Sequence, residues 1–132
     1  MIHLKSPEEI ELCALAADLV SRTLGILAPR VVPGVTPLEL DRLAEEYIRD
    51  SGGIPAFKGL YGFPNTLCIS PNDQVVHGIP GKAPIRDGDI LSVDCGVKLN
   101  GCIGDQAFTF GVGVITPEAQ KLLRITRECL DR

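Results

Sequence analysis

Tryptophan is absent from this chain of 132 residues, and other aromatic residues are scarce, with two tyrosines and four phenylalanines. Any hydrophobic core must therefore be built mostly from aliphatic side chains. Apolar residues make up 45% of the sequence, which argues against a disordered chain. The chain is long enough to bury a core, and its length fits one domain. We therefore expect a single domain over residues 1–132 with a mainly aliphatic core.

Further absences exclude several classes of protein. No apolar run approaches the roughly 20 residues of a membrane-spanning helix, and no basic segment precedes an apolar stretch at the N-terminus. The net charge is −4, and the chain has no basic run to neutralise phosphates. The five cysteines are an odd number without C-x-x-C spacing, which argues against a structural zinc site and a disulfide framework. We therefore expect a cytoplasmic protein with reduced cysteines that binds neither nucleic acid nor membrane.

Two helices begin with the same local pattern. Ser-Pro-x-Glu at residues 6–9 and Thr-Pro-x-Glu at residues 36–39 each combine an N-cap, a first-turn proline and a capping-box acid. Pro29 ends the first helix, Ser-Gly-Gly at residues 51–53 ends the second, and a third is expected over residues 116–132. Helical spacing assigns the buried faces to Ile10, Cys13, Ala14, Ala17, Val20, Leu24 and Leu27, and to Leu40, Leu43, Ala44, Tyr47 and Ile48.

The middle of the chain has the composition of strands. Short β-branched runs alternate with glycine and proline, and residues 66–70 and 74–79 are expected to be strands. Asn100-Gly101 is a strong signal for a two-residue hairpin turn, here within residues 90–110. The order helix, helix, strands, helix predicts an α+β fold with an antiparallel sheet.

Each strand of the expected hairpin carries one aspartate. A turn at Asn100-Gly101 places Asp94 opposite Ala107 and Asp105 opposite Gly96, so the two carboxylates lie on one face as diagonal neighbours. The other face is the expected core face, with Leu91, Val93, Cys95, Val97, Leu99, Cys102, Phe108 and Phe110. Two neighbouring carboxylates cost energy unless a cation or proton intervenes. A solvated sheet face shows the same alternation, and from the pattern alone this second interpretation is favoured.

Other candidate residues are ambiguous by themselves. His77 follows an apolar run, where a histidine is more often structural than catalytic. Phe57, Leu60, Phe63 and Cys68 lie in a glycine-rich segment and form either a small core or a small apolar pocket. Cys68 is a weak candidate for a nucleophile, because the chain has only two histidines.

Three segments together resemble the type I methionine aminopeptidases of bacteria: GFPNTLCISPNDQVVHGIPG, DGDILSVDCGV and NGCIGDQAFTFGVG. The resemblance runs from the first helix to near the end of the chain. It implies a pita-bread fold, of which this chain holds half, as an antiparallel sheet with helices packed on one face. It also implies a cytoplasmic hydrolase that removes the N-terminal methionine of new polypeptides and binds two divalent metal ions (manganese, cobalt, iron or zinc).

The resemblance assigns roles to individual residues. Asp94 and Asp105 match metal ligands of the family, and His77 matches a catalytic histidine that contacts the substrate. Phe57, Leu60, Phe63 and Cys68 match positions around the methionine side chain. These roles suit the residues, because carboxylates bind hard or borderline cations and a pocket with sulfur and aromatic edges suits a thioether.

The chain departs from the family because it lacks the second half of the fold, which supplies a metal-binding histidine and two glutamates. Three interpretations follow: an inactive fragment of a longer enzyme, a half-length form that dimerises, and a non-enzymatic module that binds peptides or a protein. We favour the homodimer, in which Asp94 and Asp105 of both copies surround the metals. A proline-directed peptidase such as prolidase is the runner-up within the same fold.

Overall fold

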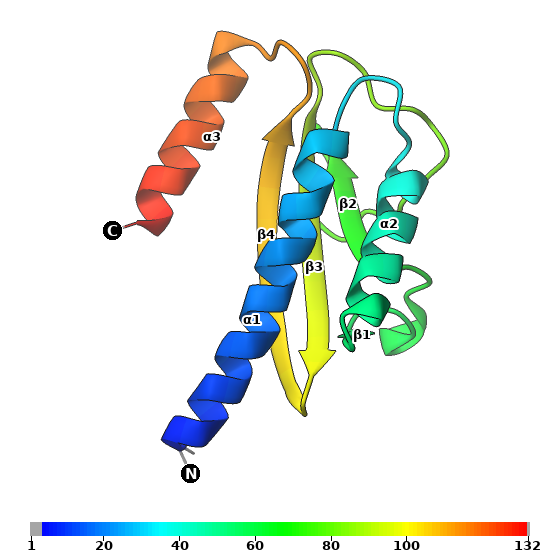
Figure 1. Ribbon diagram of the computed structural model, residues 1–132. Coiled ribbons are helices and arrows are strands. Elements are labelled where there is room, and N and C mark those ends of the chain that lie inside the picture. Colours follow the sequence, from blue (N-terminus) through cyan, green and yellow to red (C-terminus); the bar gives the residue numbers. More distant parts are fainter. Residues whose placement is uncertain (1–3, 132) are drawn as a thin grey trace.

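The structure is a computed structural model that describes residues 4–131. Its elements in chain order are α1 (Pro7–Leu27), a 3₁₀ turn (Ala28–Arg30), α2 (Pro37–Asp50), β1 (Ile54–Pro55), a second 3₁₀ turn (Leu60–Gly62), β2 (Leu67–Pro71), β3 (Ile90–Leu99), β4 (Cys102–Gly111) and α3 (Pro117–Leu130). Helices α1 and α2 lie against the sheet, whereas α3 stands apart beside β4 (Figure 1). The predicted α+β class is confirmed.

Both helix starts form as predicted. In α1 the Ser6 hydroxyl accepts a hydrogen bond from the Glu9 amide (3.2 Å), and the Glu9 carboxylate accepts one from the Ser6 amide (2.7 Å). Thr36 and Glu39 make the same reciprocal pair at α2, at 3.2 and 2.8 Å. These capping boxes satisfy backbone N–H groups that have no partner inside the helix.

The buried face of α1 differs from the predicted one. The helix buries Ala16, Leu19, Val20, Thr23, Leu24 and Leu27, which shares only its C-terminal part with the prediction. Ile10 is 57% exposed, and Ala14 and Ala17 are exposed as well, because the side of α1 that meets the sheet runs through Ala16 and Leu19 instead. In α2 the prediction is confirmed for Leu40, Ala44 and Ile48.

The core lies between these two helices and the sheet. It joins Leu19 and Val20 of α1 and Ile48 of α2 to Leu67 of β2 and Val93 of β3, all at most 1% exposed. As the composition indicated, aliphatic residues dominate it. Among residues 4–131, none of the helices has the length and apolarity needed to cross a bilayer.

Strand β3 is the centre of the antiparallel sheet. It pairs with β4 along one edge, and with β1 and β2 at successive positions along the other. The turn that joins β3 to β4 has positive φ at both Asn100 (50°) and Gly101 (83°), as a type I′ turn requires. The predicted register, in which Leu99 pairs with Cys102, is confirmed.

The core face of the hairpin is only partly buried. Leu91, Val93 and Val97 of β3 are fully buried, but Phe108 of β4 is 43% exposed. Phe108 packs instead against Phe110, with ring centroids 4.8 Å apart. The prediction that Phe108 is a core residue is therefore wrong, because β4 is an outer strand that the helices cover only in part.

Residues 74–79 form a loop, so the strand predicted there is wrong. Val75 is 83% exposed, and His77 has a φ of 59°, which an extended strand does not allow. Gly78 nevertheless contacts β2: its carbonyl accepts from the Ile69 amide (2.8 Å) and its amide donates to the Ser70 hydroxyl (3.0 Å). A side chain on Gly78 would collide with the Ile69 carbonyl, so glycine permits this approach.

Candidate metal centre

The sheet brings the two aspartates to one face. Asp94 pairs with Ala107 on β4 and with Cys68 on β2, while Asp105 pairs with Gly96. Side chains alternate along a strand, so Asp94, Asp105 and Cys68 lie on the face opposite to the one that α1 and α2 cover. We call this the aspartate face.

The carboxyl group of Asp94 is in an unfavourable environment for an anion. One of its oxygens, Oδ1, is buried and has no hydrogen-bond partner within the described residues. Burial, followed by the negative charge of Asp105, raises the pKa of Asp94 to about 6, although the charge of His77 and the Cys95 amide act in the opposite direction. A group in this state is stabilised by a proton or by a cation.

The aspartate pair fits a divalent cation as part of a ligand set. Carboxylate oxygens are suitable ligands for such ions, and the orphaned Oδ1 atom of Asp94 supplies an oxygen without another partner. However, residues 4–131 contain no group of three or more histidine, cysteine, aspartate or glutamate side chains that could hold a metal. The remaining ligands of such a site must therefore come from outside the described residues.

Phe57 forms an apolar wall beside the aspartates. A Cβ atom built on Gly96 would lie 2.5 Å from Cε1 of Phe57, so the ring occupies the space of a side chain on the aspartate face. Gly96 is two residues from Asp94 and pairs with Asp105. The missing side chain at Gly96 is what allows the aromatic ring to approach both carboxylates.

The other predicted pocket residues follow Phe57 in a tight loop. The Leu60 amide donates to the Phe57 carbonyl (3.0 Å), and the Phe63 amide donates to the Leu60 carbonyl (2.9 Å). Leu60 is 52% exposed and Phe63 is partly buried. Lys58 anchors this loop to α2 through an ion pair of 2.6 Å with Glu45. The loop therefore holds Leu60 and Phe63 near Phe57, but with much of their surface open.

The environment of Cys68 disfavours a role as a nucleophile. The residue is 7% exposed, and burial, followed by the charges of Asp94, Asp105 and Asp41, raises the pKa of its thiol to about 11. The reactive form of cysteine is the thiolate, which is scarce at neutral pH when the pKa is this high. Cys68 instead presents a neutral sulfur atom beside Asp94.

His77 is held by the loop between β2 and β3. Its φ of 59° lies in a region that non-glycine residues rarely adopt, and such strain is concentrated at functional sites. The neighbouring Gly78 is fixed to Ile69 and Ser70, which positions His77 close enough for its charge to act on Asp94. The structure thus brings His77, Asp94, Asp105, Phe57 and Cys68 together.

Asp41 is a buried carboxylate that sequence reasoning missed. It lies on α2, is 4% exposed, and accepts hydrogen bonds from the amides of Thr66 (2.9 Å) and Leu67 (2.8 Å) and from the side chain of Asn65 (2.8 Å). These bonds fix the start of β2, directly before Cys68. A charged residue directly after Leu40 on an apolar helix face was the signal in the sequence.

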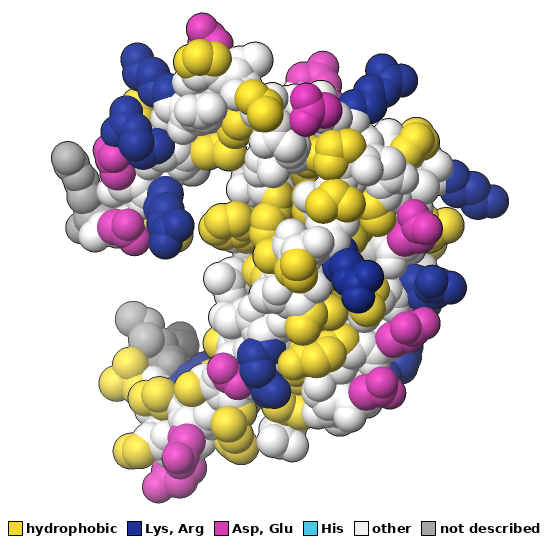
Figure 2. Space-filling model, turned by 45° about the horizontal axis from the view of Figure 1, so that its top comes forward, with side chains coloured by type: hydrophobic (Ala, Val, Ile, Leu, Met, Phe, Trp, Pro, Cys, Tyr) yellow, Lys and Arg dark blue, Asp and Glu magenta, His cyan; other side chains and the backbone are white. Residues whose placement is uncertain are grey.

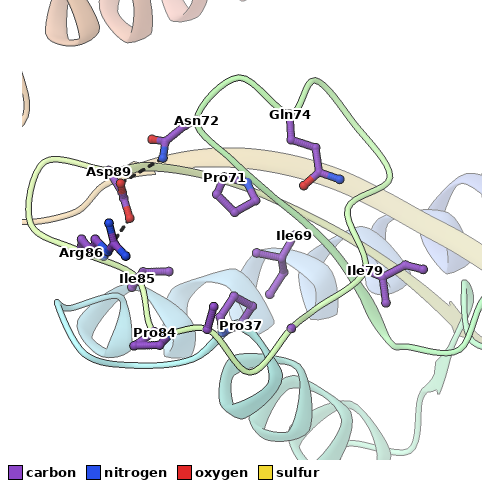
Figure 3. A pocket seen from close by; sticks show the side chains of 12 residues that line it. Pro37, Ile69, Pro71, Asn72, Gln74, Ile79, Pro84, Ile85, Arg86 and Asp89 are labelled. Carbon is purple, nitrogen blue, oxygen red and sulfur yellow. Dashed lines mark hydrogen bonds between the residues drawn. The ribbon is translucent and has the colours of Figure 1, made fainter.

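A separate pocket of about 340 Å³ lies between the start of α2 and the loop after β2 (Figure 3). There the Asp89 carboxylate accepts hydrogen bonds from the Asn72 side chain (3.0 Å) and the Arg86 amide (2.7 Å), and Asn72 Oδ1 accepts from the Ile90 amide (3.1 Å). None of the predicted site residues lines this pocket. Its polar network instead fixes both ends of the loop that carries His77.

In comparison with known proteins, a family model and individual relatives agree with each other. The model of metallopeptidase family M24 matches residues 11–132. A methionine aminopeptidase of Clostridium perfringens is 56% identical over 128 residues, which are 97% of this chain and 51% of that protein. One from Helicobacter pylori is 46% identical over 129 residues, 98% of this chain and 51% of that protein. The chain spans about half the length of the curated relatives it matches.

Solved structures agree with the sequence comparison. The methionine aminopeptidase from Thermotoga maritima superposes with a TM-score of 0.95 at 39% identity, over 99% of this chain and 53% of that chain. The prolidase from Pyrococcus furiosus superposes with a TM-score of 0.86 at 22% identity, over 98% of this chain and 37% of that chain, which shows a shared fold alone. The predicted half of a pita-bread fold is thereby confirmed.

Proposed function

Because this chain belongs to metallopeptidase family M24, we propose that it is half of a metal-dependent aminopeptidase that removes N-terminal methionine from peptides. The similarity to methionine aminopeptidases supports the reaction and the substrate. The observation that carries the proposal is the pair formed by Asp94 and Asp105 on an uncovered sheet face, with Asp94 Oδ1 buried and without a partner in the described chain.

In this proposal Asp94 and Asp105 are ligands of two divalent ions of manganese, cobalt, iron or zinc. Such ions, when bound, polarise the scissile carbonyl and activate water. The apolar wall of Phe57 and the neutral sulfur of Cys68 receive the methionine thioether, since thioethers contact aromatic edges favourably. His77 contacts the peptide and has a catalytic role.

Leu60 and Phe63 have a further role in this proposal. Both lie in the loop after Phe57, where Leu60 is half exposed. We assign them to the outer rim of the methionine pocket, which closes around the side chain when the remainder of the fold is present. This arrangement leaves the aspartates as the inner end of the site.

A second copy of the chain is the proposed source of the missing ligands. The outer edge of β4 pairs with no strand in the described chain. Next to it, Phe108 is 43%, Leu122 is 57% and Ile125 is 40% exposed. Figure 2 shows α3 projecting from the body of the molecule with a hollow between them. Open strand edges and apolar surfaces of this kind are typical of interfaces, so a symmetric homodimer covers them and adds two further aspartates.

Oligomeric mass and metal content test this part of the proposal. We expect light scattering to give the mass of a dimer, and elemental analysis to find metal that is retained with it. A monomer that retains no metal would exclude the homodimer and favour a fragment of a longer enzyme, whose remaining half supplies the ligands.

Hydrolysis of a methionyl peptide tests the reaction. With added manganese or cobalt we expect release of methionine, its loss in Asp94→Asn, and its retention in the matched control Asp50→Asn, which removes an equal charge at the end of α2. Unchanged hydrolysis by Asp94→Asn would show that the ligand assignment is wrong. Peptide binding without hydrolysis would favour a binding module, and cleavage of X-Pro dipeptides alone would favour a prolidase.

A further inference from the structure

Helix α1 and strand β4 pack against each other closely and in the same direction. A Cβ atom on Gly104 would lie 2.5 Å from the carbonyl of Ala16, so the two backbones approach each other where a side chain is missing. Further along, the Ser21 hydroxyl donates to the Gln106 side-chain carbonyl at 2.8 Å. Two residues of a strand and three to four of a helix advance by similar lengths. Positions at this spacing on α1 and β4 therefore continue to face each other.

Towards the N-terminal ends of α1 and β4, the next contact between them joins two cysteines. Cys102 precedes Gly104 by two residues on β4, and Cys13 precedes Ala16 by three on α1. The Cys102 sulfur lies 3.9 Å from the carbonyl of Glu9, which is one helical turn before Cys13. A hydrogen bond with the Cys13 thiol is the largest of the effects that raise the pKa of Cys102. The two sulfur atoms are therefore neighbours.

The remaining cysteines differ from this pair. Cys68 and Cys95 are buried and lie on opposite faces of the sheet, because Cys68 pairs with Asp94, the residue before Cys95. Cys129 is exposed near the end of α3, which stands away from the sheet (Figure 1). Cys13 and Cys102 are both partly exposed, so a small oxidant can reach them.

We propose that Cys13 and Cys102 are a redox-sensitive thiol pair that closes to a disulfide when a low-molecular-weight disulfide such as oxidised glutathione is present. One cysteine sulfur attacks the small disulfide, forms a mixed disulfide and releases one molecule of thiol. The second cysteine then displaces the other half. Two protein thiols and one small disulfide become one protein disulfide and two small thiols, and the two cysteine protons end on the released thiols.

This pair has a structural consequence that is independent of the proposed metal site. A disulfide tolerates Cα separations of only about 4.4–6.8 Å, and the contacts of β4 with Glu9 and Ala16 show that the two backbones lie close together on both sides of Cys13. The bond would tie the first half of α1 to the tip of the β3–β4 hairpin. Oxidation is thus expected to fix the hairpin that carries both aspartates against α1.

The sequence allows a direct test, because trypsin separates all five cysteines. Cleavage after lysine and arginine leaves Cys13 in residues 6–22, Cys68 in 59–82, Cys95 in 87–98, Cys102 in 99–121 and Cys129 in 128–132. The chain, in a Cys129→Ser background that prevents cross-linking between copies, is incubated with oxidised glutathione, alkylated to block free thiols, digested and analysed by mass spectrometry.

We expect a disulfide-linked pair of peptides, residues 6–22 and 99–121. The pair should be lost after reduction and in Cys102→Ser. The oxidised chain should melt about 10 °C above the reduced one, whereas Cys13→Ser and Cys102→Ser should show no such shift. The proposal is overturned if the two peptides carry separate glutathione adducts, or if either is linked to another cysteine. It is also overturned if both remain free while Cys129 of the parent chain is modified.

Discussion

At the scale of single residues, Asp94 is unlike an ordinary surface carboxylate. It has a buried oxygen atom without a described partner, and Asp105 lies diagonally across from it on the next strand. Both features disfavour the charged form in the metal-free chain. A residue that destabilises the fold and faces an open surface is better explained by a role in binding a ligand than by a role in stability.

The first prediction concerns the stability of metal-free Asp94→Asn. Because the pKa of Asp94 is raised from 3.8 to about 6, the folded chain binds this proton more tightly than the unfolded chain, and stability falls as pH rises through that interval. The variant should therefore be more stable than the parent by about 1–2 kcal/mol at pH 8, a value reduced by solvent screening of the partly exposed carboxyl. The difference should vanish near pH 4.

Urea unfolding with a chelator at both pH values measures this difference. Asp50→Asn, which removes the same charge from an exposed position on α2, serves as the control and should change stability by less than about 0.5 kcal/mol. Equal stabilities of parent and Asp94→Asn at pH 8 would support a solvated surface carboxylate instead.

The second prediction concerns Asp41, whose role is structural. Its two oxygens accept three hydrogen bonds from residues 65–67. In Asp41→Ala both oxygen atoms are lost, which leaves the buried N–H groups of Thr66 and Leu67 unsatisfied at about 1–3 kcal/mol each. We expect a loss of about 2–4 kcal/mol in the free energy of unfolding. Asn65→Ala, which removes only one of the bonds, should cost about 1 kcal/mol, and similar losses in both variants would contradict this account.

At the scale of elements, the seam between α1 and β4 determines how the hairpin is held. Gly104 meets the carbonyl of Ala16 directly, so the helix lies on the strand backbone itself rather than on a side chain. Such contacts are sensitive to a single added methyl group, because the neighbouring atoms belong to a helix backbone that cannot rotate away.

The third prediction compares two glycine-to-alanine substitutions. Gly104→Ala places its methyl group 2.5 Å from the Ala16 carbonyl, and we expect a loss of about 1–3 kcal/mol. Gly25→Ala adds the same group inside α1 where nothing lies within 4 Å, and helix propensity should raise stability by about 0.5–1 kcal/mol. Thermal unfolding of both variants measures the two effects. A Gly104→Ala variant as stable as the parent would show that the seam is looser than described.

At the scale of the whole molecule, what the sequence predicts depends on how local the interaction is. The capping boxes at residues 6–9 and 36–39 and the Asn100-Gly101 turn were predictable because each is completed within four residues. The register of the hairpin follows from that turn. The sequence alone therefore places both aspartates on one face of the sheet.

Long-range features were not predictable in this way. Phe57 covers Gly96, and Asp41 binds residues 65–67. Both contacts join segments that are far apart in the chain, and no local sequence pattern indicates that such segments meet. The two valines of residues 74–79 predict a strand, but the segment is a loop, because the positive φ of His77 depends on how Gly78 contacts β2. The apolar spacing in the first half of α1 also failed, because it does not show which side of the helix the sheet covers.

The last prediction concerns the surface that β4 presents to a second copy. Phe108 is 43% exposed and its ring packs at a tilt of 58° against that of Phe110, so Phe108→Lys should leave the fold intact. In the proposed homodimer the same change buries a charge at the interface, and aromatic residues at interface centres contribute strongly to affinity. We expect the dissociation constant of the dimer to rise at least about 100-fold. Val32→Lys, at a residue 50% exposed in the loop after α1, is the control and should leave it unchanged. Analytical ultracentrifugation over a range of concentrations measures both variants, and an unaltered dimer in Phe108→Lys would place the interface elsewhere.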